Sequence, residues 1–364
     1  DWQSIIKFFI MFPLYTVATR QQRTFYRTFS QHGTGSAMVE LEPKDVALLV
    51  HISYLDIFEK AAEWFDERFF NIAQRDFYKI ERKDVDALPE LTVDGAIRYL
   101  QLSGVTDTEN IIYLYMKNLS ELWRRRFKFY NILKTQSFPT TEQIGPRCLL
   151  EYGNCDDKLL FSWMTWRKLI YDVDNRSAQE TGYLFEPILA SCLGGEPMSH
   201  RNSPVKRIDA QGNRTNEGRQ VDCYIEEAKE VYELKLRVTI AASGQGRFGE
   251  EMSFPYEARK AGLTPILIVF DPTPSALLEK LKLKYLEEGG RCAIGEEAWK
   301  MLITRAGKEM GKYIEKYIKP PISKMEEMNI VKPQNIHLST SKESIIISDE
   351  AHERYIIPRS VIIE

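Results

Sequence analysis

Residues 218–240 read GRQVDCYIEEAKEVYELKLRVTI and contain two β-like runs joined by a charged turn. Alternate side chains of a strand point to the same face, so Glu233 and Lys235 are expected to lie side by side. Leu234 and the aliphatic residues after it then face the opposite, apolar side. Asp222 lies on the preceding run. The stretch predicts two adjacent strands with one polar face.

The residue types on that polar face indicate a chemistry. An acid on one strand and Glu-x-Lys on the next can hold a magnesium ion beside a phosphate and place an ammonium near the attacking water. Glu-x-Lys also occurs at 42–44, 81–83 and 227–229, but none of those copies lies in a strand-like run. Only Glu233-Leu234-Lys235 lies within the alternating, β-branched run 231–240. The alternative interpretation is a solvated strand face with a cross-strand ion pair.

Composition narrows the possible functions. The chain has 364 residues, 43 % of them apolar, which is enough for two domains with ample core. Its net charge of −3 requires any nucleic-acid surface to be made by local clustering. Five cysteines without a CxxC pair and five scattered histidines argue against zinc and favour a hard, oxygen-liganded ion.

The pattern of apolar residues changes along the chain. Residues 1–140 have mostly helical spacing, strongest at 46–70 and 111–133, and Pro139 and Gly145-Pro146 indicate a boundary. The elements predicted beyond it are a helix at 177–193, a strand near 205–208, a polar loop at 209–219, strands at 221–225 and 231–240, a helix at 250–261, a buried strand at 264–270, helices at 275–288 and 296–318, and a hairpin at 336–357.

Three regions follow from this pattern. They are a helical amino-terminal region at 1–140 for DNA binding or dimerisation, a catalytic α/β region at 141–320, and a β-hairpin extension at 321–364. The apolar run at 5–15 is interrupted by Lys7 and Pro13 and is too short to span a bilayer. It is expected to be a buried helix, and the protein is expected to be cytoplasmic, without a membrane partner.

The order helix, strand, strand, strand, helix, strand, with Asp222 and Glu233-Leu234-Lys235 on neighbouring strands, resembles the core of the PD-(D/E)xK nucleases. The segments ELKLRVTIAASGQGRFGEEMSFP and TPILIVFDPTP look like type II restriction endonucleases, in particular the ApaLI-like group. The resemblance covers about residues 176 to 271. It departs from the family pattern at Val221, where a proline is usual. It implies an α/β fold in which helices flank a mixed sheet.

The resemblance also implies a set of site residues. Asp222 and Glu233 would bind Mg²⁺ through their carboxylates, the Leu234 carbonyl would add a backbone ligand, and Lys235 would orient the attacking water. A further acid is often donated by the preceding helix, and Glu186 is preferred over Glu180 for that role. The proline after Glu186 disfavours helical geometry at that residue and leaves its role open.

Several basic residues are candidates for contact with DNA. The glycine-rich loop 243–249 lets the backbone approach a phosphate and presents Ser243, Gln245 and Arg247. Arg214 and Arg219 belong to the predicted polar loop 209–219. Two more basic sets occur in the helical region. Arg20, Arg23 and Arg27 share a helical face, whereas the basic-aromatic run 123–130 is expected to be structural, with Phe127 and Tyr130 in the core and its arginines solvated or paired with acids such as Glu121.

These observations favour a sequence-specific double-strand DNA endonuclease that needs Mg²⁺. A homodimer is expected, because two identical active sites related by a two-fold axis can cut both strands of a palindromic site. The alternatives are a repair, recombination or modification-dependent nuclease of the same fold, and a non-catalytic DNA-binding protein. A protein that only binds DNA has no use for two carboxylates facing the DNA, because carboxylates repel the phosphates.

Overall fold

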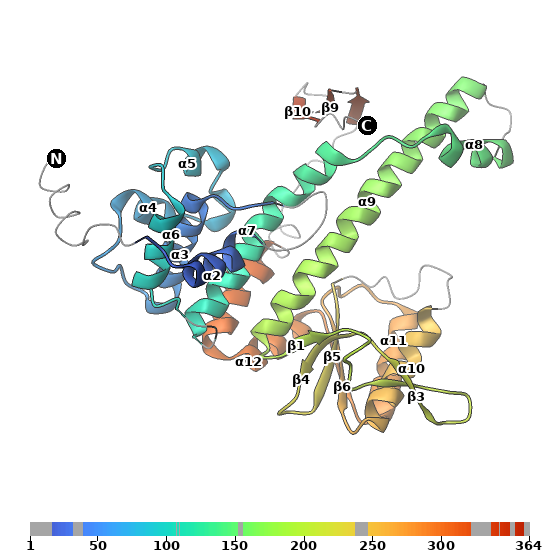
Figure 1. The fold of residues 1–364 in the computed structure, drawn as a ribbon. Helices are drawn as coiled ribbons and strands as arrows, with labels where there is room; N and C mark the ends of the chain where they lie inside the picture. The colour runs from blue at the N-terminus through green and yellow to red at the C-terminus, as the bar shows by residue number, and fades with distance from the viewer. Residues whose placement is uncertain are drawn as a thin grey trace, which may run out of the picture. The chain divides into compact units, whose positions relative to one another are not determined.

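A computed structural model describes residues 17–31, 39–106, 108, 110–151, 156–236, 247–321, 336–341, 343–349 and 354–359. The chain forms two compact units, residues 1–128 and 129–364 (Figure 1). The sequence had suggested a boundary near residue 140. The difference arises because helix α7 (Ile111–Thr135) starts in the first unit and continues without a break into the second.

The described part of the first unit is helical, as its apolar spacing predicts. Its elements are α2 (Arg20–Ser30), α3 (Pro43–Phe58), α4 (Glu67–Ala73), the 3₁₀ turn η1 (Phe77–Lys79), α5 (Arg82–Asp86), α6 (Val93–Leu102) and most of α7. Helix α3 is the central element, because residues 44–53 are all buried and the helix contacts both α4 and α6. A helix that is apolar on all sides is expected to lie inside a domain.

The second unit is built on a five-stranded mixed sheet with the order β1-β4-β5-β6-β7. Its strands are β1 (Glu196–Met198), β4 (Val221–Ile225), β5 (Glu230–Lys235), β6 (Thr264–Val269) and β7 (Arg291–Ile294). Strand β4 pairs antiparallel with β1 and β5, whereas β5, β6 and β7 run parallel. The predicted mixed sheet is therefore confirmed, and β6 is buried almost throughout, as its continuous apolar run requires.

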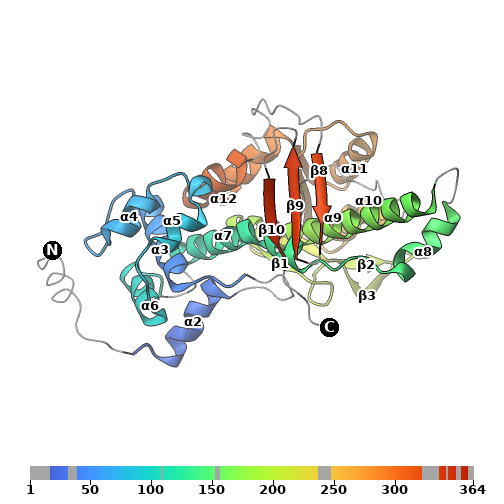
Figure 2. The ribbon, with the colours of Figure 1, turned by 90° about the horizontal axis from the view of Figure 1, so that it is seen from above.

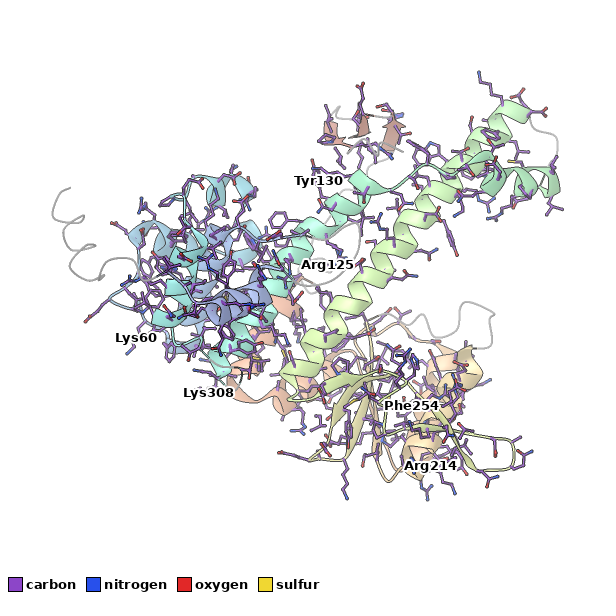
Figure 3. All side chains as sticks on the ribbon, in the orientation of Figure 1. Lys60, Arg125, Tyr130, Arg214, Phe254 and Lys308 are labelled. Atoms are coloured by element: carbon purple, nitrogen blue, oxygen red, sulfur yellow. The ribbon has the colours of Figure 1, made fainter. Side chains whose placement is uncertain are left out.

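Helices cover both faces of this sheet. On one face, α10 (Arg247–Lys260) and α11 (Ala276–Glu287) pack on β6, and the core there joins Val231 and Val269 to Phe254, which Figure 3 labels. The opposite face receives α9 (Asp157–Cys192), where Cys223 lies against the Ala190 carbonyl at 3.9 Å, and α12 (Glu296–Tyr313), which contacts β7 and continues into the π-helical turn η2 (Ile314–Ile318). The sheet is thus flanked by helices.

Helix α9 departs most from the sequence prediction. It has 36 residues and starts twenty residues before the predicted position, and Pro187 lies inside it. A proline removes one helical hydrogen bond, and its ring crowds the preceding turn. Burial of Ile188, Leu189 and Ala190 in the next turn offsets the free-energy cost of the proline. The helix predicted at 177–193 is therefore confirmed across Pro187, and Glu186 is helical although the proline disfavours that geometry.

Other local predictions also need correction. Gly145-Pro146 lies within helix α8 (Thr141–Leu150) instead of marking a break. The predicted polar loop at 209–219 contains strand β3 (Arg214–Gly218), which pairs with β2 (Lys206–Ile208). The carboxyl-terminal segment forms three antiparallel strands, β8 (Ile336–Thr340), β9 (Ser344–Asp349) and β10 (Arg354–Pro358), where a hairpin was predicted (Figure 2).

The apolar run at 5–15, expected to be a buried helix, lies outside the described residues. Among the helices that the structure describes, none combines the length and the hydropathy needed to cross a membrane.

Candidate active site

The polar face of the β4–β5 pair carries the predicted acids. Cys223 pairs with Tyr232 across the two strands, and extending that register by one position sets Asp222 opposite Glu233. Directly opposed residues of an antiparallel pair share a face. Asp222 is buried, and its Oδ2 accepts a hydrogen bond of 2.8 Å from the Leu234 amide. The two acids therefore converge at the amino-terminal end of β4.

The backbone amide and carbonyl of Leu234 point toward β4 and Asp222. Successive residues of a central strand direct their backbone groups to opposite neighbours. The Lys235 carbonyl accepts a hydrogen bond from the Phe270 amide on the β6 side, so the groups of Leu234 point toward β4. There the Leu234 amide meets Asp222. The Leu234 carbonyl therefore lies on the side of the strand that carries the acid.

Lys235 lies between two carboxylates. Its Nζ is 3.1 Å from Oε1 of Glu233 and 3.2 Å from Oε1 of Glu251 on α10. Burial alone would lower the pKa of this ammonium, but Glu233, Glu251 and Asp222 together outweigh burial and hold the pKa above its ordinary value. The side chain therefore remains a cation at neutral pH.

The carboxyl groups of the site repel one another, and this repulsion adds to the effect of burial on their pKa values. Burial, followed by repulsion from Glu233, raises the pKa of the Glu186 carboxyl on α9 to about 7, although Lys235 acts in the other direction. Burial is also the largest cause of a strongly raised pKa at Asp222, and Glu233 and Glu186 add to it. Carboxylates in this state are stabilised by a nearby cation. The single ammonium of Lys235 does not balance them.

The donor set suits a hard divalent ion. Across the described residues, no group of three or more His, Cys, Asp or Glu side chains is arranged to hold a metal. Magnesium requires less, because it retains several waters and usually takes one or two carboxylates together with phosphate oxygens. Asp222 and Glu233 supply two carboxylates, and the Leu234 carbonyl supplies a third oxygen. The residues present therefore fit magnesium.

Glu251 belongs to this cluster, although sequence reasoning missed it. It follows Glu250 directly, and adjacent helical residues point in different directions, so only one of the two can face the sheet. Oε1 of Glu251 contacts Lys235, and its Oε2 is a buried oxygen without a hydrogen-bond partner among the described residues. The apolar side of α10 is the signal that could have found it, because Glu251 lies three residues before the buried Phe254 and thus on the side that faces the sheet.

The predicted DNA-contacting residues are placed unevenly. Ser243 and Gln245 lie outside the described residues, and Arg247 is the first residue of α10, so the predicted loop is shorter at that end. Arg214 is exposed on β3, where Figure 3 labels it, and its Nη2 donates a 3.3 Å hydrogen bond to the Pro204 carbonyl. Its predicted role in DNA binding stays a prediction.

Arg219 is built into the unit. Its side chain is buried, its Nε donates to Oε2 of Glu257 at 2.5 Å, and its Nη2 donates to the Glu250 carbonyl at 3.1 Å. These contacts tie the segment before β4 to helix α10. Arg219 therefore helps to hold α10, and with it Glu251, over the polar face of the sheet.

The basic sets of the first unit are engaged by protein groups. Arg23 pairs with Asp94 at 2.6 Å, and Arg126 donates to the carbonyls of Phe77, Tyr78 and Ile80. Arg124 is buried and pairs with Glu121. The structural interpretation of the run 123–130 is thus confirmed: Arg124 pairs with the predicted acid Glu121, whereas Arg126 binds backbone carbonyls. Tyr130 was predicted to be a core residue but is exposed.

Two opposed acids and a lysine at one end of a mixed sheet make a candidate site for a metal-dependent nuclease. The chain belongs to the ApaLI-like restriction endonuclease family, whose model matches residues 81–319. The type II restriction enzyme ApaLI of Acetobacter pasteurianus is 39% identical over 335 residues, which are 90% of this chain and 87% of that enzyme. No solved structure matches the chain.

The family resolves the alternatives left open by the sequence. The chain is a restriction endonuclease, a deoxyribonuclease that cuts at specific sequences, and the interpretation as a non-catalytic binder is set aside. The match starts at residue 81 and thus includes the last part of the first unit, residues 81–128. The resemblance seen in the sequence covered only residues around the β4–β6 core.

Proposed function

We propose that this chain hydrolyses phosphodiester bonds of double-stranded DNA with Mg²⁺ at Asp222, Glu233 and Lys235, within a PD-(D/E)xK type of core. The observation that carries the proposal is the register of β4 and β5, which sets Asp222 opposite Glu233. Lys235 follows two residues later on the same face. Two acids and an ammonium at the end of a sheet are the groups that metal-assisted phosphate hydrolysis requires.

Each residue has a distinct role in this proposal. Asp222 and Glu233 hold the metal through their carboxylates, and the Leu234 carbonyl completes the protein ligands. When bound, the metal supplies Lewis-acid chemistry and an acidified water. Lys235, kept cationic by Glu233 and Glu251, orients the attacking water and offsets negative charge that develops on the phosphate.

Glu186 is the preferred additional acid. Burial, and then repulsion from Glu233, raises its pKa to about 7, and its own charge adds to the raised pKa of Asp222. The continuous helix α9 supports this choice, because it keeps Glu186 on a rigid element near the sheet. Glu180 lies six residues earlier and therefore points to a different side of the helix. Glu186 would contribute to the metal site or hold one of its waters.

A homodimer follows from the reaction. A double-strand break requires two cuts on antiparallel strands, and a two-fold pair of identical sites makes both with one recognition surface. The DNA contacts are proposed for the segment that carries Ser243, Gln245 and Arg247, and for Arg214.

Digestion of phage DNA with purified protein tests the function. We expect discrete fragments with common end sequences in Mg²⁺ and intact DNA in EDTA, with Asp222→Ala as the matched inactive protein. Discrete cutting in EDTA would refute the metal requirement. Equal cutting by Asp222→Ala would refute the assigned site while leaving the family assignment in place.

A further inference from the structure

The first half of helix α9 carries an exposed apolar stripe. Leu159, Trp163, Trp166 and Ile170 are between 36 % and 62 % exposed, although they are large and apolar. Their spacing of four, three and four residues places them within an arc of about 60° on one side of the helix. We call these four residues the α9 stripe. Contiguous apolar patches on a protein surface usually mark an interaction site.

The stripe is not the face that α9 uses within its own unit. Leu160 and Met164 are buried on a different side, where they pack with Ile144 of α8. Figures 1 and 2 show α8 beside the start of α9, consistent with their contacts. The stripe is therefore a second apolar side of α9, and the described part of the chain leaves it exposed.

We propose that the α9 stripe is the homodimer interface, where it packs antiparallel against the same stripe of a second copy of this chain. The inference deepens the proposed homodimer and rests on it. The four-three-four spacing is that of apolar residues in a helix-on-helix seam. It reads the same in both directions, so antiparallel copies match, with Leu159 against Ile170 and Trp163 against Trp166.

The area of the stripe fits a dimer. From its exposed fractions, the stripe offers roughly 450 Å² of surface per copy, taking full areas of about 200 to 250 Å² for each residue. Two copies would bury roughly 900 Å², largely apolar. Because about 60 % of an interface is apolar, the whole contact would approach 1,500 Å², the size of a standard stable complex.

The charges around the stripe favour a protein partner over DNA. Residues 156–176 contain four acidic and four basic side chains, so this segment has no net charge. A surface for DNA is expected to be basic, because phosphate contacts dominate affinity. A neutral segment with an apolar stripe fits a second copy of itself.

Sedimentation equilibrium of the full chain tests the interface. We expect a wild-type dimer at micromolar concentration and at least tenfold weaker association for Trp163→Glu and Ile170→Glu. Phe161→Glu and Tyr171→Glu are matched controls, because both residues are exposed on the same helix outside the stripe and should leave the dimer intact. Circular dichroism checks that every variant is folded.

A mixing experiment tests the antiparallel order. Trp163→Glu and Trp166→Lys proteins should each associate weakly alone but pair when mixed, because the new charges face each other in one layer. A mixture that stays monomeric would refute that order. A monomeric wild type, or stripe variants that remain dimers but bind DNA less tightly, would overturn the proposal. Cleavage by Asp222→Ala tests the active site separately, since that protein should remain a dimer.

Discussion

Two buried aspartates, one in each unit, have opposite surroundings. In the first unit, Asp45 is almost fully buried, and its carboxylate accepts from Arg82 at 3.0 and 3.1 Å and from Trp123 Nε1 at 3.0 Å. The Glu42 amide adds a further hydrogen bond. In the second unit, the carboxylates of Asp222, Glu233, Glu186 and Glu251 share the ammonium of Lys235.

This difference separates a structural charge from a functional one. A buried charge with a full set of donors supports the fold, and removing a partner is costly. A cluster with more acids than donors weakens the fold unless a cation arrives, and perturbed acids of this kind gather at functional sites. The comparison therefore gives Asp45 a structural role and supports the catalytic role proposed for Asp222, although both are buried aspartates.

The largest expected effect is on cleavage. Alanine at Asp222, Glu233 or Lys235 should slow single-turnover cleavage by a factor of a hundred or more, since losing charge stabilisation in such a site costs about 3 kcal/mol. Rates measured in Mg²⁺, with dimer content and folding checked in parallel, test this. Cleavage by Glu233→Ala at the wild-type rate would refute the proposed active site.

An isosteric pair of substitutions tests the comparison directly. Asp45→Asn removes the charge that faces Arg82 and should lower the free energy of unfolding by about 2 kcal/mol. Asp222→Asn retains an oxygen for the Leu234 amide and relieves repulsion, so stability in EDTA should be unchanged or higher. Urea unfolding at pH 7.5 measures both. Equal destabilisation by the two changes would contradict the distinction.

Much of the sheet could be predicted from the sequence. Strand β4 has the predicted bounds, and β6 differs by one residue, because a strand buried on both faces needs a long apolar run. Strands β1 and β7 were missed, since three or four residues are too few to display alternation. The first twenty residues of α9 were missed because their apolar residues lie on several sides of the helix, so their spacing shows no single helical stripe.

Only part of the candidate site could be predicted from the sequence, and the reason is related. Asp222, Glu233 and Lys235 are close in sequence and joined by one hairpin, so strand alternation alone brings them together. Glu251 reaches Lys235 from another element, and its contact depends on how α10 is held by Arg219. Pairings that depend on the docking of a helix are not encoded in a local pattern.

A smaller effect is expected at Glu251. Glu251→Gln keeps the shape of the side chain but weakens its hold on the Lys235 ammonium, so single-turnover cleavage should slow about tenfold. DNA affinity in Ca²⁺ should change little. Glu250→Gln is the matched control, because its carboxylate faces Arg207 and Arg219. Equal loss in both variants would point to a general effect on α10.

The smallest effect concerns pH and metal. The folded pKa of Glu186, about 7, lies above its ordinary value of 4.5, so its contribution to stability is present below pH 4.5 and is lost as the pH rises through 7. Metal binding offsets that loss, and the rise in Tm on adding Ca²⁺ should therefore be larger at pH 7.5 than at pH 5. Differential scanning fluorimetry at both pH values measures it. Glu186→Gln removes the titrating group and should reduce the pH dependence of Tm by roughly a few degrees. A Ca²⁺ response that is equally pH-dependent in this variant would assign the titration to another acid of the cluster, with Asp222 the first to test.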